Sequence, residues 1–271
     1  MAVLTSDFLH VSLGLLAGSL LIVLGFVTLS RDKDYRLNQL FSTFFLLIAL
    51  FFILDSALVF LSTEEIVSDP FALNLLRDMY LVSLIIGLAV GGIAAVYIRY
   101  GMEMTYSRKL MLVGGVTLFA ILVLGLLGDS VVVSGHGHES GEGHHGLEIS
   151  RNLGGWAGVV GSLVLFLSIM GYYIGFTAIT SDQETKSRLI RLLAGQLLMV
   201  GVSMIFDVSF AFNVIGQLVD NDLIHLTLHL VVVAGGILSL SSFWRTQAQP
   251  DSHSQEGLST SDTSVLPPTS N

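Results

Sequence analysis

The sequence of 271 residues contains no cysteine and few charged residues. The absence of cysteine excludes disulfides, thiolate metal sites and cysteine nucleophiles. Only 12% of the residues are charged, roughly half of the share that is usual in a soluble domain. With 52% hydrophobic residues and a mean hydropathy of +0.77, the composition indicates a polytopic membrane protein that lies in a lipid bilayer.

The apolar residues fall into seven long runs that lack the alternation of β-barrel strands. Each run has about 20 residues or more, which is enough for a helix to cross a hydrocarbon core of about 30 Å. The sequence therefore predicts an all-α fold, a bundle of seven transmembrane helices within residues 1–245. The runs are 8–30, 40–61, 79–99, 110–128, 153–178, 189–216 and 223–244. The Ser/Thr/Pro-rich segment 246–271 predicts a disordered cytoplasmic tail.

The basic residues are distributed asymmetrically between the loops that join these runs. Basic residues near span ends stay on the cytoplasmic side, so the pattern predicts an outside N-terminus and an inside C-terminus, as in a plasma-membrane protein. Ten of the twelve basic residues then lie inside: Arg31, Lys33, Arg36, Arg99, Arg108, Lys109, Lys186, Arg188, Arg191 and Arg245. Arg77 and Arg151 are assigned to the outside.

Acidic residues dominate the side predicted to be outside. Eleven of them are assigned there: Asp7, Glu64, Glu65, Asp69, Asp78, Asp129, Glu139, Glu142, Glu148, Asp220 and Asp222. Such a surface attracts cations and repels nucleic acid. Lysine is missing from every apolar run, which excludes a retinal protein of the microbial type, because that class needs a Schiff-base lysine in its last helix.

The longest predicted outer loop, residues 129–152, is rich in histidine and glycine. Imidazoles with nearby carboxylates bind Zn²⁺ and other divalent transition metals, and glycines let a loop wrap around an ion. A solvated low-complexity loop that binds metal only opportunistically is an equal interpretation. The candidate ligands are His136, His138, His144 and His145.

Glycines recur at four-residue spacing within several runs, a pattern that lets helix backbones approach closely. The spacing predicts packing within one bundle or, alternatively, a dimer face. The pairs are Gly14/Gly18, Gly87/Gly91, Gly154/Gly158 and Gly171/Gly175.

Two carboxylates fall inside the predicted spans, Asp55 in the second and Asp207 in the sixth. Ionisable groups within a bilayer are costly and usually face the bundle interior. His225 and His229 open the seventh span, and His10 lies at the same level in the first. These five residues, with Asn213, are predicted to share the outer third of the membrane.

His225 and His229 are four residues apart, so they project from one helix face. They are candidate metal ligands, as is His10, with Asp207 or Asp55 as a further ligand, a partner of an imidazole, or a catalytic base. Hydrogen bonding that serves only helix packing is the alternative.

Two segments, 29–61 and 184–208, resemble the seven-helix sensor regions at the N-terminus of prokaryotic histidine kinases. The resemblance lies in a basic "RLN" turn before "FSTFFLLIAL" and in "ETKSRLIRLL" before the sixth span. It implies a sensor that signals to a protein partner inside the cell. No kinase domain is expected within these 271 residues.

A second, shorter resemblance concerns "FDVSF" followed by "HLTLH". It is similar to the superfamily of seven-helix metallohydrolases that includes alkaline ceramidases. That resemblance implies zinc ligation by His225 and His229, together with a third histidine in the second helix. This chain has Asp55 and Ser56 in that part of the second helix.

Three functions follow as hypotheses. The first is a sensor-like or receptor-like protein without catalysis, whose outer pocket binds a cation or small ligand. The second is a zinc-dependent hydrolase of lipid amides or esters, with Asp207 or Asp55 as base or ligand. The third is transport of metal cations, which has little support because the inner third of the spans lacks ionisable groups.

Overall fold

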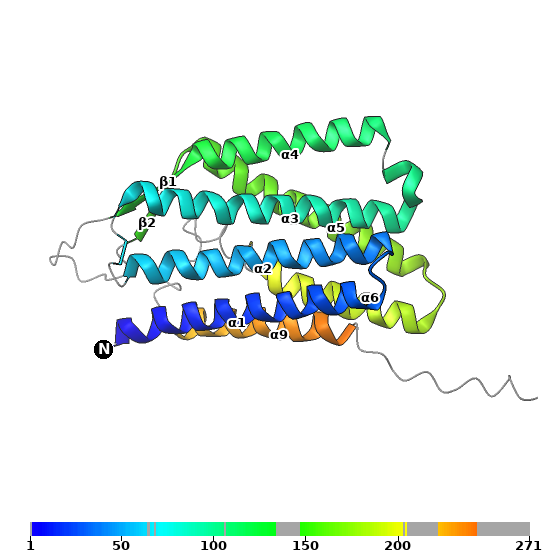
Figure 1. Cartoon of the computed structure of the whole chain (residues 1–271), viewed down its shortest axis with the longest axis horizontal. Helices are drawn as coiled ribbons and strands as arrows, with labels where there is room; N and C mark the ends of the chain where they lie inside the picture. Colours follow the sequence, from blue (N-terminus) through cyan, green and yellow to red (C-terminus); the bar gives the residue numbers. More distant parts are fainter. Residues whose placement is uncertain are drawn as a thin grey trace, which may run out of the picture.

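The computed structural model describes residues 2–63, 66–67, 69–105, 107–133, 147–202, 204 and 222–242. The helices are α1 (Ala2–Arg31), α2 (Arg36–Thr63), α3 (Pro70–Thr105), α4 (Arg108–Gly128), α5 (Leu153–Ile179), α6 (Gln183–Gln196) and α9 (Asp222–Ser242). A short π-helix, η1 (Leu197–Gly201), continues α6. Figure 1 shows the long helices side by side with roughly parallel axes.

The chain is all-α apart from one small hairpin between α4 and α5. Strands β1 (Asp129–Val133) and β2 (Leu147–Arg151) pair antiparallel, with Asp129 opposite Arg151 and Val133 opposite Leu147. The sequence predicts a loop for the whole of residues 129–152, and the paired strands correct that prediction. The strands form where valines and an isoleucine replace the Gly/His pattern, because β-branched residues favour paired strands.

Among the described residues, five helices are long and apolar enough to cross a membrane. They are Val11–Arg31, Arg36–Ser62, Pro70–Gly101, Met111–Gly128 and Leu153–Ile179. This is the build of a polytopic membrane protein, and each of these spans contains most of a run predicted from the sequence. The sixth and seventh predicted spans are described only in part, at 189–202 with 204 and at 223–242, so a count of seven spans stays a prediction.

The core lies around α2. Phe45 and Ile48 are fully buried there and pack with Leu21 of α1, Leu88 of α3 and Phe166 of α5. By contrast, α4 lies at the periphery of the bundle. Many apolar side chains in its first half and at its middle, such as Leu112 and Phe119, are exposed. An apolar outward surface of this kind suits contact with lipid rather than with water.

Three of the four glycine pairs lie at helix contacts inside the bundle. A methyl group added at Gly18 would lie 2.8 Å from Ile53 of α2, and one at Gly158 would lie 2.8 Å from Gly125 of α4. The Gly87/Gly91 pair meets Ile48 and Phe44 of α2. Packing within one bundle is therefore confirmed for these pairs, whereas an added methyl at Gly171 would meet nothing within 4 Å.

The closest approach of α6 and α9 is also at glycines. A methyl group added at Gly195 would lie 2.6 Å from the Gly235 carbonyl oxygen, and one at Gly235 would lie 2.7 Å from the Gly195 carbonyl oxygen. Beside this crossing, Gln196 Nε2 donates a hydrogen bond of 3.3 Å to Ser239 Oγ in a buried position. The two helices are thus held by backbone proximity and one buried polar contact.

Candidate polar site at the hairpin end

The predicted site residues lie at the end of the bundle that carries the hairpin. At this end α1, α3 and α9 begin and α2 ends (Figure 1). His10 is in α1, Asp55 is in α2, and His225 and His229 are in the first two turns of α9. The structure describes the backbone, but not the side chains, of these three histidines.

Each of these residues lies within about three turns of its own helix end. Asp55 is eight residues before the end of α2 and Arg77 seven residues after the start of α3, which corresponds to about 12 and 10 Å of helical rise. The same rise places His10 about 12 Å into α1 and His229 about 10 Å into α9. Asp55 is half-buried and is not without an interaction partner.

The structure places an ion pair inside a candidate span, where the sequence predicts an outer loop. Arg77 and Asp78 were assigned to an outer loop, and only two carboxylates were expected within spans. In the structure α3 begins at Pro70, so both residues lie two turns inside a candidate span. Arg77 Nη2 is 2.5 Å from Asp78 Oδ1. The mutual neutralisation of the two charges lets the helix continue through a position where the sequence suggested a boundary.

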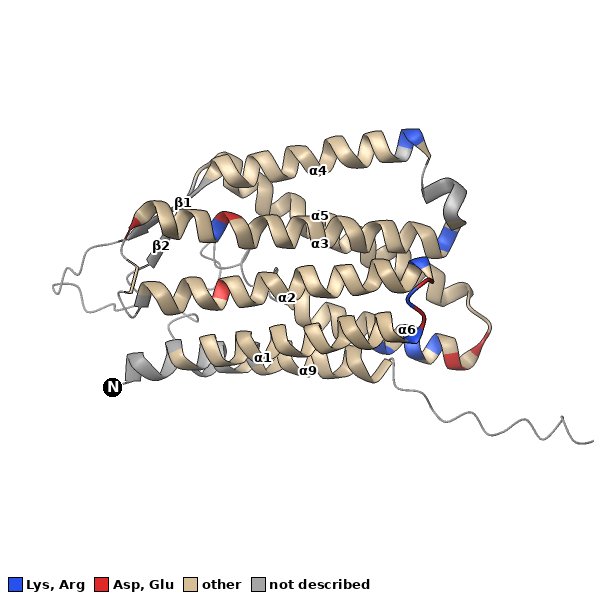
Figure 2. Cartoon of the chain, in the orientation of Figure 1, with Lys and Arg blue, Asp and Glu red and all other residues tan. Residues whose placement is uncertain are grey.

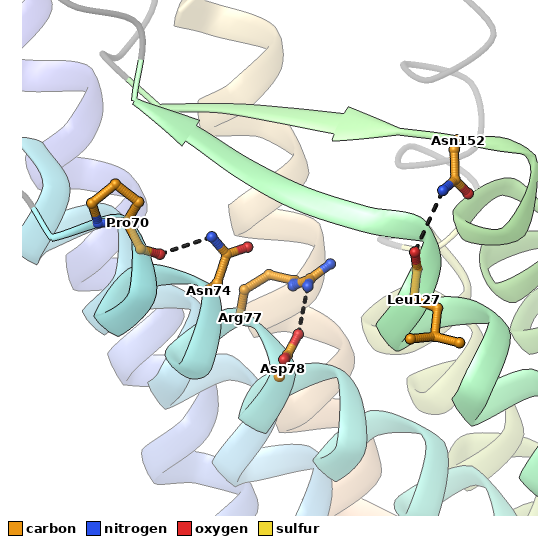
Figure 3. Close-up of polar contacts among 6 residues, drawn as sticks. All are labelled: Pro70, Asn74, Arg77, Asp78, Leu127 and Asn152. Atoms are coloured by element: carbon orange, nitrogen blue, oxygen red, sulfur yellow. Dashed lines mark hydrogen bonds and ion pairs between the residues drawn. The ribbon is translucent and has the colours of Figure 1, made fainter.

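Arg77 is the most deeply buried charged residue among those that the structure describes, with 2% of its surface exposed. Figure 3 shows its side chain extending from α3 below the hairpin, toward the side where Leu127 and Asn152 close the hairpin base. The Asp78 side chain is 36% exposed. The guanidinium therefore faces the protein interior while its partner carboxylate lies near the edge.

Asn152 fixes the hairpin to the helices on both sides of it. Its backbone N–H donates a hydrogen bond of 2.8 Å to the Gly128 carbonyl oxygen, and its side-chain Nδ2 donates one of 3.4 Å to the Leu127 carbonyl oxygen. Its Oδ1 accepts from the N–H groups of Gly154 and Gly155, which caps α5. This side-chain cap gives α5 a defined start directly after β2, so the hairpin is held over the Arg77 side chain (Figure 3).

The other predicted site residues lie outside the described part of the chain. These are Asp207, Asn213, His136, His138, His144 and His145. Within the described part, no group of three or more His, Asp or Glu side chains is placed to hold a metal ion. The predicted zinc ligands and the predicted catalytic pair of Asp55 and Asp207 therefore stay predictions.

The two ends of the bundle differ in charge as the sequence predicts. Figure 2 shows the lysines and arginines of the described chain gathered at the end opposite the hairpin, apart from the arginine of the buried ion pair and the undescribed side chains drawn in grey. The turn between α1 and α2 at that end is built by Asp32, whose Oδ1 accepts from the N–H groups of Asp34 and Tyr35. Short turns of this kind keep the basic residues close to the helix ends.

Comparisons with known proteins give no relative: no family model matches the chain, and neither a curated protein nor a solved structure matches it. The resemblances to histidine-kinase sensor regions and to alkaline ceramidases thus stay predictions.

Proposed function

We propose that this chain is a sensor-like integral membrane protein whose polar layer binds a divalent cation. The polar layer comprises Asp55 and the Arg77–Asp78 pair, together with His10, His225 and His229. In this proposal the hairpin end faces outside and the basic end faces the cytoplasm, following the positive-inside rule. Binding shifts the helices, and a protein partner at the basic end reads that shift.

The observation that carries the proposal is the buried Arg77–Asp78 pair inside a candidate span. A buried ion pair adds little stability over apolar packing, so its presence in a membrane helix favours a functional role. The described charges of the layer, two carboxylates and one guanidinium, leave one net negative charge. That balance favours a cation as ligand.

Helix contacts connect the two ends of the bundle. The α2 helix, which carries Asp55, contacts both α1 and α3 along its length, and its first residue, Arg36, lies at the basic end. A displacement of α2 at the polar layer would therefore reach the basic end through a rigid element. Couplings of this kind are typically worth 1–3 kcal/mol.

Spin labels can test this proposal, because the cysteine-free chain accepts single cysteines without a background. Labels at Asp34→Cys and Ser181→Cys, both exposed at the basic end, would report helix displacement by electron–electron distance measurement. We expect Zn²⁺ to change the distance distribution in the parent chain and not in Asp55→Asn.

The matched control is Asp69→Asn, an exposed carboxylate at the hairpin end, which should keep the response. A distance distribution that Zn²⁺ and other divalent cations leave unchanged would refute the sensor proposal. Mass spectrometry would then measure the metal content of the parent chain and of His225→Ala/His229→Ala. The zinc hydrolase hypothesis requires zinc that the parent chain retains and the variant loses.

A further inference from the structure

A cavity of about 410 Å³ opens at the basic end of the bundle, far from the polar layer. Its volume is in the range of about 300–1,000 Å³ that small-molecule sites occupy. Six helices (α1, α2, α3, α5, α6 and α9) and the turn before α2 supply its wall. The lining residues that matter here are Arg31, Tyr35, Asn38, Tyr97, Thr185 and Arg188.

The polar part of this wall is rich in hydrogen-bond donors and carries positive charge. Arg31 and Arg188 contribute two guanidinium groups, and none of the described lining residues is acidic. The tyrosine and threonine hydroxyls and the Asn38 amide can donate further hydrogen bonds. Two guanidinium groups on one cavity wall attract an anion into the space beside them.

Arg188 has a donor that the protein itself does not use. One guanidinium nitrogen of Arg188 pairs with Glu184 on the same helix face. Its Nε is buried and has no hydrogen-bond partner among the described residues. Buried donors usually have an acceptor in folded proteins, so this Nε, on the cavity wall, is available to a ligand that brings acceptor oxygens.

The remainder of the wall is apolar, and it continues toward the centre of the bundle. Phe41, Leu189 and Leu192 line both this cavity and a smaller enclosed one of about 20 Å³. That smaller space can hold about one water molecule. Tyr173 and Gln196 line it, and the Tyr173 hydroxyl and Gln196 Oε1 are buried without partners among the described residues. The side chains that line the wall are therefore basic at the end of the bundle, and aromatic or aliphatic nearer its centre.

The position of the cavity along the helices matches the level of lipid headgroups. At this end of the bundle, the candidate span in α1 ends at Arg31, the span in α2 begins at Arg36, and the span in α5 ends at Ile179. Basic pockets between helices at the cytoplasmic surface are sites where anionic headgroups bind. Phosphate suits the donors present, since guanidinium groups bind its oxygens in bidentate geometry.

We propose that this cavity is a binding site for a phosphate group, held by Arg31 and Arg188 at its wall. The phosphate is carried by an anionic lipid headgroup or by a soluble phosphate ester, which share this chemistry. The inference does not depend on the proposed sensor function, because the cavity and the polar layer lie at opposite ends of the bundle.

Binding to the full, delipidated chain in a neutral detergent tests the site. The two probes are short-chain phosphatidic acid and glycerol 3-phosphate, titrated with native mass spectrometry as the readout. We expect Arg31→Gln and Arg188→Gln each to weaken binding by roughly tenfold, the usual effect of losing a hydrogen-bonded charge. The control Arg108→Gln removes an exposed arginine at the same end that does not line the cavity, and it should bind within about twofold of the parent chain, since a charge outside the site contributes little.

Binding of phosphatidic acid alone would identify a lipid headgroup as the source, and binding of both probes would extend the site to soluble phosphate esters. Arg188→Lys keeps the positive charge but loses the planar guanidinium group that binds phosphate through two N–H groups. An intermediate affinity would support bidentate contact. It would also show that the weaker binding does not result from misfolding. Equal weakening by Arg108→Gln, unchanged affinity in both cavity variants, or no saturable binding of either probe would overturn the proposal.

Discussion

At the scale of single residues, the stability of α3 depends on the Arg77–Asp78 ion pair. A guanidinium that is 2% exposed in an apolar helix needs its carboxylate, since an uncompensated charge in such a place is strongly destabilising. The pair is therefore sensitive to the loss of one member and tolerant of the loss of both.

Replacing one member of this pair should cost more than replacing both. We expect Asp78→Leu to lower the free energy of unfolding by about 3 kcal/mol, because it removes the carboxylate that is in contact with the buried Arg77 guanidinium. The double variant Arg77→Leu/Asp78→Leu should recover most of that loss. Thermal unfolding in detergent, followed by circular dichroism, measures both. A double variant less stable than Asp78→Leu would contradict this account.

Asp182 contributes to the stability of the folded protein in a way that depends on pH. It caps α6 by accepting a hydrogen bond of 2.8 Å from the Thr185 amide. The hydrogen bonds from Thr185 hold the pKa of Asp182 below its ordinary value. Because its pKa is lower in the folded state, the cap stabilises the protein above the unfolded-state pKa, and this contribution is lost as the pH falls through the folded-state pKa.

The corresponding test compares the parent chain with Asp182→Asn, which can still cap the helix but does not titrate. The parent chain should lose more thermal stability than the variant as the pH falls below about 4, the ordinary pKa range of aspartate. Parallel Tm curves for the two proteins from neutral to acid pH would show that the cap carries no linked proton.

At the scale of elements, glycine positions decide how closely the helices pack. The α6–α9 crossing brings two backbones together at Gly195 and Gly235, and backbone atoms cannot move aside as a flexible side chain can. By contrast, Gly171 faces open space on α5. The same substitution therefore has opposite consequences at the two kinds of position.

Gly195→Ala should destabilise the bundle by about 1–3 kcal/mol, as overpacking of a tight contact does. Gly171→Ala is the matched control and should be neutral or stabilising by up to about 1 kcal/mol, because alanine is the better helix former. Thermal unfolding of the two variants in one detergent gives the comparison. A stable Gly195→Ala variant would show that α6 and α9 do not cross at these glycines.

At the scale of the whole molecule, the separation of charge predicts how the bundle is oriented in a membrane. The basic residues gather at the end opposite the hairpin (Figure 2), and such residues are retained on the cytoplasmic side. If the orientation proposed above holds, positions at the two ends differ in their access to reagents that cannot cross a membrane.

Single cysteines in the cysteine-free chain provide the test. Ile66→Cys, at an exposed position between α2 and α3, should react with an impermeant maleimide in intact cells. Ser181→Cys, exposed between α5 and α6, should react only after the membrane is permeabilised. The reverse pattern would invert the proposed topology and move the polar layer to the cytoplasmic side.

The apolar helices could be predicted from the sequence, whereas one boundary and one ion pair could not. The run at 79–99 was bounded by its flanking charges, yet α3 begins at Pro70. Hydropathy counts each charge as unfavourable in a span, and only the folded chain shows that the Arg77 guanidinium is buried and in contact with the Asp78 carboxylate. A proline that opens a helix is a signal for the true start. The basic-end cavity had no comparable signal, since its wall comes from residues far apart in the sequence.

The sequence by itself determined the membrane-protein class, the long apolar helices and the accumulation of basic residues at one end of the bundle. These follow from composition and from local hydrophobic patterns, which need no knowledge of neighbours in space. Tertiary structure decided what lies next to what: the buried Arg77 side chain below the hairpin, Gly195 against Gly235, and Arg31 on one cavity wall with Arg188. Such contacts depend on helix rotation and packing, which the order of residues along one helix does not specify.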